Sequence, residues 1–188
     1  MCGPCSLSFL MHQFGEKNLP ADIAKELIID REFGIGLFDL AHLPVDRGYN
    51  TKLFAWSAEH FPVSWRNSSP EKIKTLLEKE HLKPGSWKNS LFSFLQKGGC
   101  FYAAPISTEE IEKNLRNGFG VILYLDSAVL YKHADGVWGH YGVLKRCGQQ
   151  RWNIVDPHWK YGGHKSYPKD LILFSFYSAG GYCLFMKK

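Results

Sequence analysis

The chain has 188 residues, of which 45% are hydrophobic and 15% aromatic, and its formal net charge at pH 7 is +5. A chain of this length and composition buries roughly 70% of the surface that its unfolded form exposes, so it needs no disulfide bonds to fold. Its basic residues are scattered and usually have Asp or Glu nearby, as in SSPEKIKTLLEKEHLK, which argues against a nucleic-acid-binding surface.

No run of about 18 apolar residues occurs, and no basic stretch followed by a long apolar one opens the chain, so we expect a cytoplasmic protein without a membrane span. The cysteines, at positions 2, 5, 100, 147 and 183, have no repeating spacing, unlike a secreted disulfide framework. Most are expected to be buried free thiols that pack as small hydrophobic side chains, and at least one to be reactive.

The first part of the chain has helical periodicity. Apolar residues recur at positions 7, 10, 11 and 14, which predicts a helix that begins near Cys2 and ends at Gly15. A second helix is predicted over PADIAKELII, with Pro20 at its start. A third is predicted over GLFDLAHLPVDRG, where Pro44 should end or bend the helix.

Two further helices are predicted from their start sequences. Ser68 followed by Glu71, and Ser107 followed by Glu110, resemble capping boxes in front of amphipathic, exposed segments. The stretch between them, KPGSWKNSLFSFLQKGGCFYAAP, is punctuated by Gly and Pro and is assigned only as a helix plus a loop.

From Gly120 onward the pattern becomes extended. GVILYLD is a short apolar run, GHYGVLKRC and QRWNIVDP flank a turn at Gly148, and GGYCLFMKK closes the chain. These segments predict a C-terminal antiparallel sheet. Because we find no repeat or linker, we predict one α+β domain over residues 1–188, with the helices first and the sheet second.

Residues 2–5 read CGPC, the four letters that thioredoxin-like oxidoreductases use as a redox disulfide. Such a site needs its cysteines on the turn between a central strand and a helix, and one residue precedes Cys2 here. A zinc site lacks a second cysteine pair or a closely spaced histidine pair. We therefore interpret Cys2 as a thiol at a helix start, where the helix dipole favours thiolate, with a redox pair to Cys5 as an alternative.

A nucleophilic thiol needs a base and a group that orients the base. His140 is the most suggestive histidine, because it starts a strand between Gly139 and Gly142, which let backbone and substrate come close. The hairpin that turns at Gly148 brings its two ends together, so Asp156 is expected beside His140. Solvent-facing or packing positions are predicted for His12, His42, His60, His81 and His133.

These residues resemble the papain-like cysteine peptidases of the bacteriocin-processing type, which cleave leader peptides, and their stand-alone relatives. The family's Cys-Gly-Pro helix start is matched by CGPCSLSFLMHQFG, and its Gly-rich and Leu-rich helix by GIGLFDLAHLPVDRGYNTKLF. Its Gly-His-Tyr and Asp-Pro strand ends are matched by WGHYGVL and NIVDP. The similarity covers most of the chain and is weakest between about residues 55 and 104.

The resemblance implies a papain-like α+β fold and thiol-dependent hydrolysis of a peptide or amide bond. It makes Cys2 the nucleophile, His140 the general base and acid, and Asp156 the residue that orients the imidazole. It also implies a peptide or protein substrate and a free-standing hydrolase. We expect no cofactor, metal, nucleic-acid partner or membrane partner, and the oligomeric state is not indicated.

Three alternatives stay open on the sequence alone. An acyltransferase or peptide cyclase would use the same three residues but pass the acyl group to an amine. A non-catalytic peptide-binding relative is the second, because the family's oxyanion glutamine lies a few residues before the nucleophile and only Met1 precedes Cys2 here. Removal of Met1 would make Cys2 an N-terminal nucleophile.

Trp138 and Trp159 either line the cleft or pack in the core, and we favour the core.

Overall fold

The computed structural model describes residues 1–27, 29, 34–57, 60–132 and 139–188. The helices are α1 (Cys2–Gln13), α2 (Pro20–Glu26), α3 (Leu37–Asp46), the short 3₁₀ helix η1 (Val63–Trp65), α4 (Pro70–Glu78), α5 (Trp87–Gln96), α6 (Thr108–Arg116), α7 (Ser127–Tyr131) and α8 (Lys169–Ser178). The strands are β1 (Asn50–Phe54), β2 (Cys100–Tyr102), β3 (Gly120–Asp126), β4 (Gly139–Cys147), β5 (Arg151–Asp156), β6 (Gly163–Pro168) and β7 (Cys183–Lys187).

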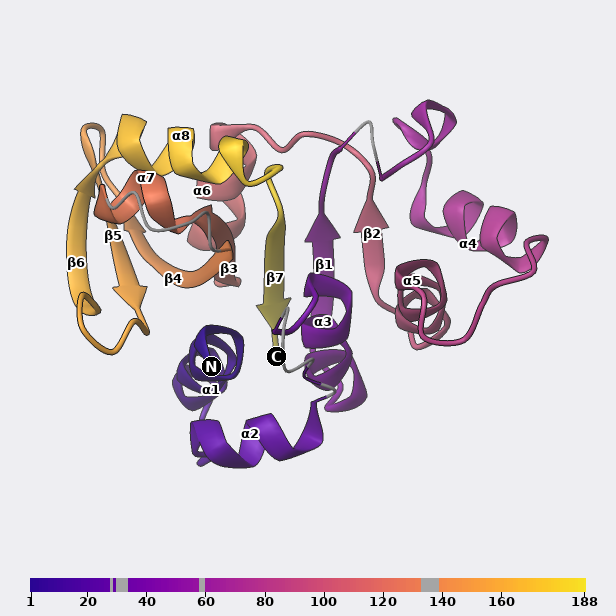
Figure 1. Ribbon diagram of the computed structural model, residues 1–188, viewed down its shortest axis with the longest axis horizontal. Coiled ribbons are helices and arrows are strands. Elements are labelled where there is room, and N and C mark those ends of the chain that lie inside the picture. Colours follow the sequence, from indigo (N-terminus) through magenta and orange to yellow (C-terminus); the bar gives the residue numbers. More distant parts are fainter. Residues whose placement is uncertain (28, 30–33, 58–59, 133–138) are drawn as a thin grey trace.

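Within these ranges the strands form one seven-stranded sheet in the order β2-β1-β7-β3-β4-β5-β6 (Figure 1). The pair β1 and β2 is parallel, and every other neighbouring pair is antiparallel. The α+β class and the hairpin of β4 and β5 agree with the sequence prediction. The predicted order of helices first and sheet second is wrong, because β1 and β2 come from the first part of the chain.

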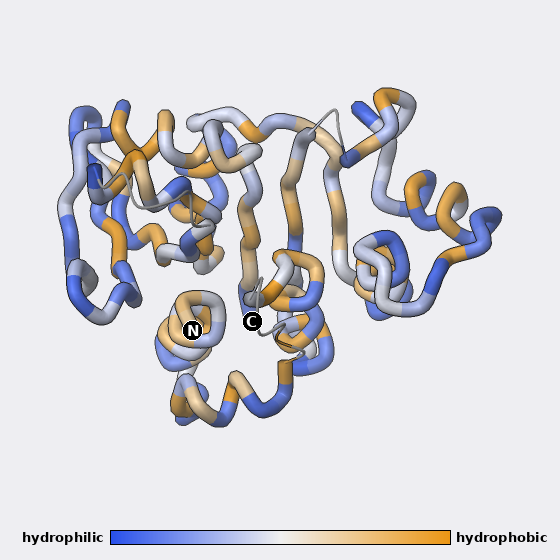
Figure 2. Tube along the Cα trace, in the orientation of Figure 1, coloured by the Kyte–Doolittle hydropathy of each residue, from blue (hydrophilic) through white to orange (hydrophobic). Residues whose placement is uncertain are grey.

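The strands that the sequence did not predict lack a clear alternation of apolar and polar residues. β1 has five residues and β2 has three, too few to show a period of two between flanking helices. β6 is an edge strand with exposed side chains. Figure 2 shows it blue to pale, whereas the inner strand β7 is largely tan to orange.

Helices cover both faces of the sheet. On β3, Ile122 belongs to a hydrophobic cluster that includes side chains of α1 and α3. Its neighbours Val121 and Leu123 belong to a second cluster with side chains of α6 and α8. Successive strand side chains point to opposite faces, so β3 is buried on both. Among the described residues, no helix combines the length and apolar character needed to cross a membrane.

Helix α1 forms where the sequence predicts it. Leu7, Leu10 and Met11 lie on one stripe and are almost fully buried, and each such side chain contributes about 1.5–3 kcal/mol of transfer free energy. Gly15 has a φ of +89°, a left-handed conformation that suits the residue after a helix end. Packing of this stripe against β3 and β4 holds the N-terminal end of α1 at the sheet.

Three predicted helix boundaries need correction. α2 ends at Glu26, before the end of the predicted segment PADIAKELII, because Leu27 is extended. α3 continues past Pro44 to Asp46, so the proline does not end this helix. α4 is capped by Ser69, whose Oγ accepts from the backbone N–H of Lys72, and not by Ser68. Pro70 occupies the first helical position, and a residue that precedes proline disfavours helical geometry, so Ser69 becomes the cap.

The cap of α6 is confirmed and gives a first test. Ser107 Oγ accepts from the backbone N–H of Glu110. Ser107→Ala should lower the free energy of unfolding by about 1 kcal/mol, because that N–H loses its acceptor. Urea denaturation measures the change. Ser93→Ala, inside α5, should change it by less than about 0.5 kcal/mol, and an equal loss in both variants would contradict the capping role.

Candidate active site

Cys2 is the first residue of α1, which packs against β4. Its side chain is partly buried, and burial opposes ionisation of the thiol. Hydrogen bonds to Sγ from the His140 ring and the Tyr141 backbone, together with the imidazolium charge, outweigh burial. The pKa of the Cys2 thiol is therefore lowered from its ordinary value of 9.0. This is the environment that favours a thiolate near neutral pH.

His140 is the second residue of β4 and is only 6% exposed. Its Nε2–H donates to Oδ1 of Asp156 over 2.8 Å, which leaves Nδ1 as the ring nitrogen for Cys2. Burial disfavours the charged ring, but the hydrogen bonds to Asp156 and Cys2 and their negative charges favour it more. The pKa of His140 is raised to about 9, so Cys2 and His140 favour a thiolate–imidazolium pair.

Asp156 ends β5 and reaches His140 because the β4–β5 pairing slips by one residue. A β-bulge lies between residues 144 and 146, and beyond it Val143 pairs with Val155. Directly paired residues point to the same face of a sheet, so Val143 and Val155 share one face. His140 lies three residues from Val143, and Asp156 lies one residue from Val155, so both point to the other face. Without the extra residue Asp156 would oppose Val143 and point away from His140.

Asp156 is 3% exposed and its carboxylate is fully engaged. Oδ1 also accepts from the backbone N–H of His158, and Oδ2 accepts from the hydroxyls of Tyr131 and Tyr167. Burial would raise the pKa of Asp156, but hydrogen bonds from His140 and Tyr131 and the imidazolium charge lower it to about 2. The carboxylate thus stays charged and fixed in place.

Sequence reasoning missed these partners of Asp156. Tyr131 ends α7 and Tyr167 lies in β6, so both depend on elements that the sequence did not predict. The His158 contact had a readable signal, because an aspartate often accepts from the backbone two residues later. The contact with Asp156 also affects the tyrosine: burial and the Asp156 charge raise the pKa of Tyr167 to about 12.

Aromatic rings surround the imidazole on the β5–β6 side. The ring of His158 lies 6.1 Å from that of His140 and stacks with Tyr161 at 4.9 Å. Trp159 stacks on His158 at 6.2 Å and is 89% exposed, so the expectation of core packing is wrong for Trp159. A loop rather than a strand carries it, which leaves its outer face to solvent. Trp138 lies outside the described residues.

The two glycines beside His140 serve protein packing. A Cβ on Gly139 would collide with the hydroxyl end of Tyr124, and a Cβ on Gly142 would come within 2.9 Å of Ile154 Cγ2. Tyr124 is half-buried, and burial and the Cys2 charge raise its pKa. The glycines therefore admit the Tyr124 and Ile154 side chains close to the backbone of β4.

Apart from His158, which contacts Asp156 and His140, the other cysteines and the histidines discussed from the sequence do not join this group. Cys183 is buried, Cys5, Cys100 and Cys147 are partly buried, and all are free thiols. The exposed histidines agree with the prediction of solvent-facing side chains at His12, His60 and His81. His133 is outside the described part of the chain. Within that part, no group of three or more His, Cys, Asp or Glu side chains could hold a metal ion.

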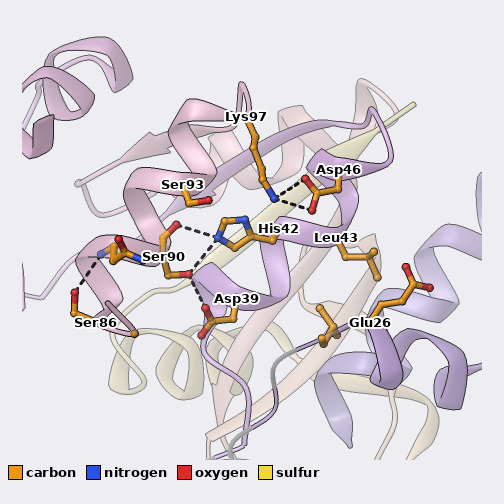
Figure 3. Close-up of a pocket in the computed structure, with 12 residues that line it drawn as sticks. Glu26, Asp39, His42, Leu43, Asp46, Ser86, Ser90, Ser93 and Lys97 are labelled. Atoms are coloured by element: carbon orange, nitrogen blue, oxygen red, sulfur yellow. Dashed lines mark hydrogen bonds and ion pairs between the residues drawn. The ribbon is translucent and has the colours of Figure 1, made fainter. Parts of the chain in front are cut away.

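A second polar cluster, shown in Figure 3, lines a cavity of about 450 Å³ between α3 and α5. His42 Nε2–H donates to the backbone oxygen of Ser90 over 3.0 Å, and Ser90 Oγ donates to Asp39 over 2.5 Å. The serine proton therefore goes to the carboxylate and not to the imidazole. Burial lowers the pKa of His42, and its Nδ1 has no partner. This cluster is not arranged as a Ser-His-Asp nucleophile.

The comparisons with known proteins agree with this architecture. No protein-family model and no curated protein matches the chain. Among solved structures, the chain is similar to a double glycine motif protease from an AMS/PCAT transporter, solved in complex with the leader peptide. The identity is 16%, the match covers 100% of this chain and 84% of that one, and the TM-score is 0.53. The chain has a papain-like peptidase fold.

A Bacillus anthracis protein described as a C39-like peptidase is also similar in structure, at 15% identity and a TM-score of 0.50. That match covers 100% of this chain and 88% of the other. The papain-like fold predicted from the sequence is thus confirmed. At these identities the likeness concerns the fold.

The carboxylate network gives a second test. The folded-state pKa of Asp156 is depressed from 3.8 to about 2, so its contribution to stability is complete above about pH 4 and is lost as the pH falls through about 2. Tyr131→Phe removes one hydrogen bond to this charge and should lower the free energy of unfolding at pH 7 by about 1–3 kcal/mol. The difference from the wild type should shrink as Asp156 becomes protonated.

Urea denaturation between pH 1.5 and 7 measures this effect. Tyr177→Phe is the matched control, because the Tyr177 hydroxyl donates to the backbone oxygen of Ile106. The decrease in the free energy of unfolding of Tyr177→Phe should be smaller, and it should not change with pH as Asp156 titrates. A Tyr131→Phe loss that is independent of pH would contradict the bond to the carboxylate.

Proposed function

We propose that this protein hydrolyses a peptide or amide bond by thiol chemistry. The observation that carries the proposal is the hydrogen-bonded chain from the Cys2 thiol through the His140 ring to the Asp156 carboxylate. Each pKa is moved in the direction that the chemistry needs: the thiol's down, the imidazole's up and the carboxylate's down.

In the proposed reaction the Cys2 thiolate attacks the carbonyl carbon and His140 protonates the leaving amine. Water then attacks the thioester while His140 accepts its proton. Asp156 holds the ring so that Nδ1 points at the sulfur. The backbone N–H of Cys2 is at the first helical position, has no acceptor within the helix and belongs to the attacking residue, so we propose it as one oxyanion donor.

We propose a peptide substrate. Two facts support this class: the fold is shared with peptidases, and one structural neighbour was solved with a leader peptide. An acyltransferase or cyclase would form the same thioester and pass it to an amine. Product analysis by mass spectrometry, with and without an added primary amine, separates hydrolysis from transfer.

Cys2 should react with iodoacetamide at pH 6–7 at least about tenfold faster than Cys5, because the pKa of Cys2 is lowered and that of Cys5 is raised. His140→Ala should remove this advantage. Peptide hydrolysis should fall as the pH rises through about 9, where the His140 imidazolium loses its proton. Labelling is followed on the tryptic peptide that ends at Lys17.

The labelling rates distinguish an enzyme from a non-catalytic binding module. Equal labelling of Cys2 and Cys5 would favour a non-catalytic peptide-binding relative. His42→Ala is the matched histidine control, since His42 lies in the separate cavity of α3 and α5, and it should leave the labelling rate of Cys2 within about twofold. A large change in that variant would contradict the assignment of His140 as the base.

Trp159 offers a test of substrate binding. Because His140 protonates the leaving amine, the rings next to His140 lie on the leaving-group side of the scissile bond. Trp159→Ala should raise KM about two- to tenfold for peptides with an aromatic residue there, with a smaller effect on kcat. Val63→Ala removes another exposed side chain, between β1 and α4, and should have no effect. Equal KM values for wild type and Trp159→Ala would exclude this role.

A further inference from the structure

The proposed chemistry uses Cys2 and leaves the second cysteine of CGPC without a role. Gly3 and Pro4 are buried, whereas Cys2 and Cys5 are both partly exposed. The two thiols therefore lie on the same side of α1, and the residues between them face the core. Their closeness has an electrostatic effect, because the charge of Cys2 is among the causes that raise the pKa of Cys5.

Helix geometry brings these two residues within disulfide range. Residues i and i+3 of an α-helix have Cα atoms about 5 Å apart, and disulfides span about 4.4–6.8 Å between Cα atoms. The Cβ atoms, about 5–6 Å apart in a regular helix, have to approach by about 1–2 Å to reach the typical disulfide separation of about 3.8 Å. The first turn can adjust, because its N–H groups are not all held within the helix.

The other cysteines are poorly placed for the same reaction. Cys183 is buried in β7, and Cys100 lies in β2 at the far edge of the sheet. Cys147 is seven residues along β4 from His140, a distance of about 23 Å in an extended strand. The reaction partner of an oxidised Cys2 within this chain is thus Cys5.

A two-step oxidation needs one thiol that reacts with peroxide and a second thiol that stays protonated until the first has reacted, and Cys2 and Cys5 differ in this way. Hydrogen bonds from His140 and Tyr141 stabilise the Cys2 thiolate, and a thiolate is the form that attacks a peroxide. Burial keeps Cys5 as a thiol while Cys2 is charged. Once Cys2 becomes a neutral sulfenic acid, that repulsion is gone and Cys5 can ionise more easily.

We propose that Cys5 is a resolving thiol, which closes a reversible disulfide with Cys2 when a peroxide oxidises Cys2. In the first step the Cys2 sulfur attacks one peroxide oxygen, the O–O bond breaks, and Cys2–SOH and hydroxide form. In the second step the Cys5 sulfur attacks the Cys2 sulfur, the S–O bond breaks and water leaves. The peroxide takes up two electrons, one from each sulfur. The inference rests on the nucleophilic Cys2 of the proposed function.

The disulfide would block peptide hydrolysis while it protects the nucleophile. A sulfenic acid without a neighbouring thiol is oxidised further to sulfinic acid, which thiol reductants do not reverse. A disulfide with Cys5 returns to two thiols on reduction. The CGPC sequence thus acts as a peroxide-responsive modification site on a peptidase-like helix.

The test is oxidation of the whole protein with a small excess of hydrogen peroxide, followed by the mass of the tryptic peptide of residues 1–17. This peptide contains Cys2 and Cys5 and no other cysteine. In the wild type it should lose about 2 Da and regain that mass with dithiothreitol, together with at least about 80% of Cys2 labelling. In Cys5→Ser and Cys5→Ala, Cys2 itself should gain about 32 Da, and Cys2 labelling should not return. Fragmentation of the peptide places the added oxygen on Cys2 rather than on Met1 or Met11.

Cys100→Ser is the matched control and should behave as the wild type. Wild-type protein that gains about 32 Da without forming the disulfide would overturn the proposal, as would equal recovery in the Cys5 variants. The failures are distinguishable. Slow labelling of Cys2 before oxidation counts against the proposed function, whereas fast labelling without a disulfide counts against the resolving role alone.

Discussion

The hydrogen bond from His140 to Asp156 depends on one extra residue in a strand. β4 and β5 pair in two registers, on either side of the bulge between residues 144 and 146. A shift of one residue sends every following side chain to the opposite face of a sheet. The bulge therefore decides that the imidazole and the carboxylate share a face, and the pKa values of both groups follow from that contact.

The position of the thiol depends on a different contact, the packing of α1 on β3 and β4. Buried side chains on one stripe of α1 hold the helix against the sheet, so its first residue meets the start of β4. The contact that places Cys2 is a helix–sheet interface, whereas the contact between His140 and Asp156 is set by the strand register. The two are independent of each other. The site lies where they meet, between an N-terminal helix and a C-terminal hairpin that are distant in sequence.

Asp156 is the most constrained residue of the group. Its two oxygens accept from a ring nitrogen, a backbone N–H and two tyrosine hydroxyls, contributed by four different segments. A buried carboxylate is costly unless it is paired and hydrogen-bonded, and here each oxygen has two donors. This arrangement gives the imidazole a permanent negative partner, and the imidazole in turn stabilises the thiolate. The neighbouring thiol, Cys5, has no such support and stays protonated.

Much of this organisation could be predicted from local sequence. The stripe of α1, the glycine that ends it, the turn at Gly148 and the strand ends at His140 and Asp156 depend on periodicity and turn chemistry, which act over a few residues. The short strands β1 and β2 could not be predicted, because their pairing partners lie far along the chain. The edge strand β6 pairs with its neighbour β5 but is exposed along most of its length, so it shows no alternation of apolar and polar residues. The bulge, the tyrosines on Asp156 and the exposure of Trp159 were decided by tertiary structure, since each depends on which distant segments pack together.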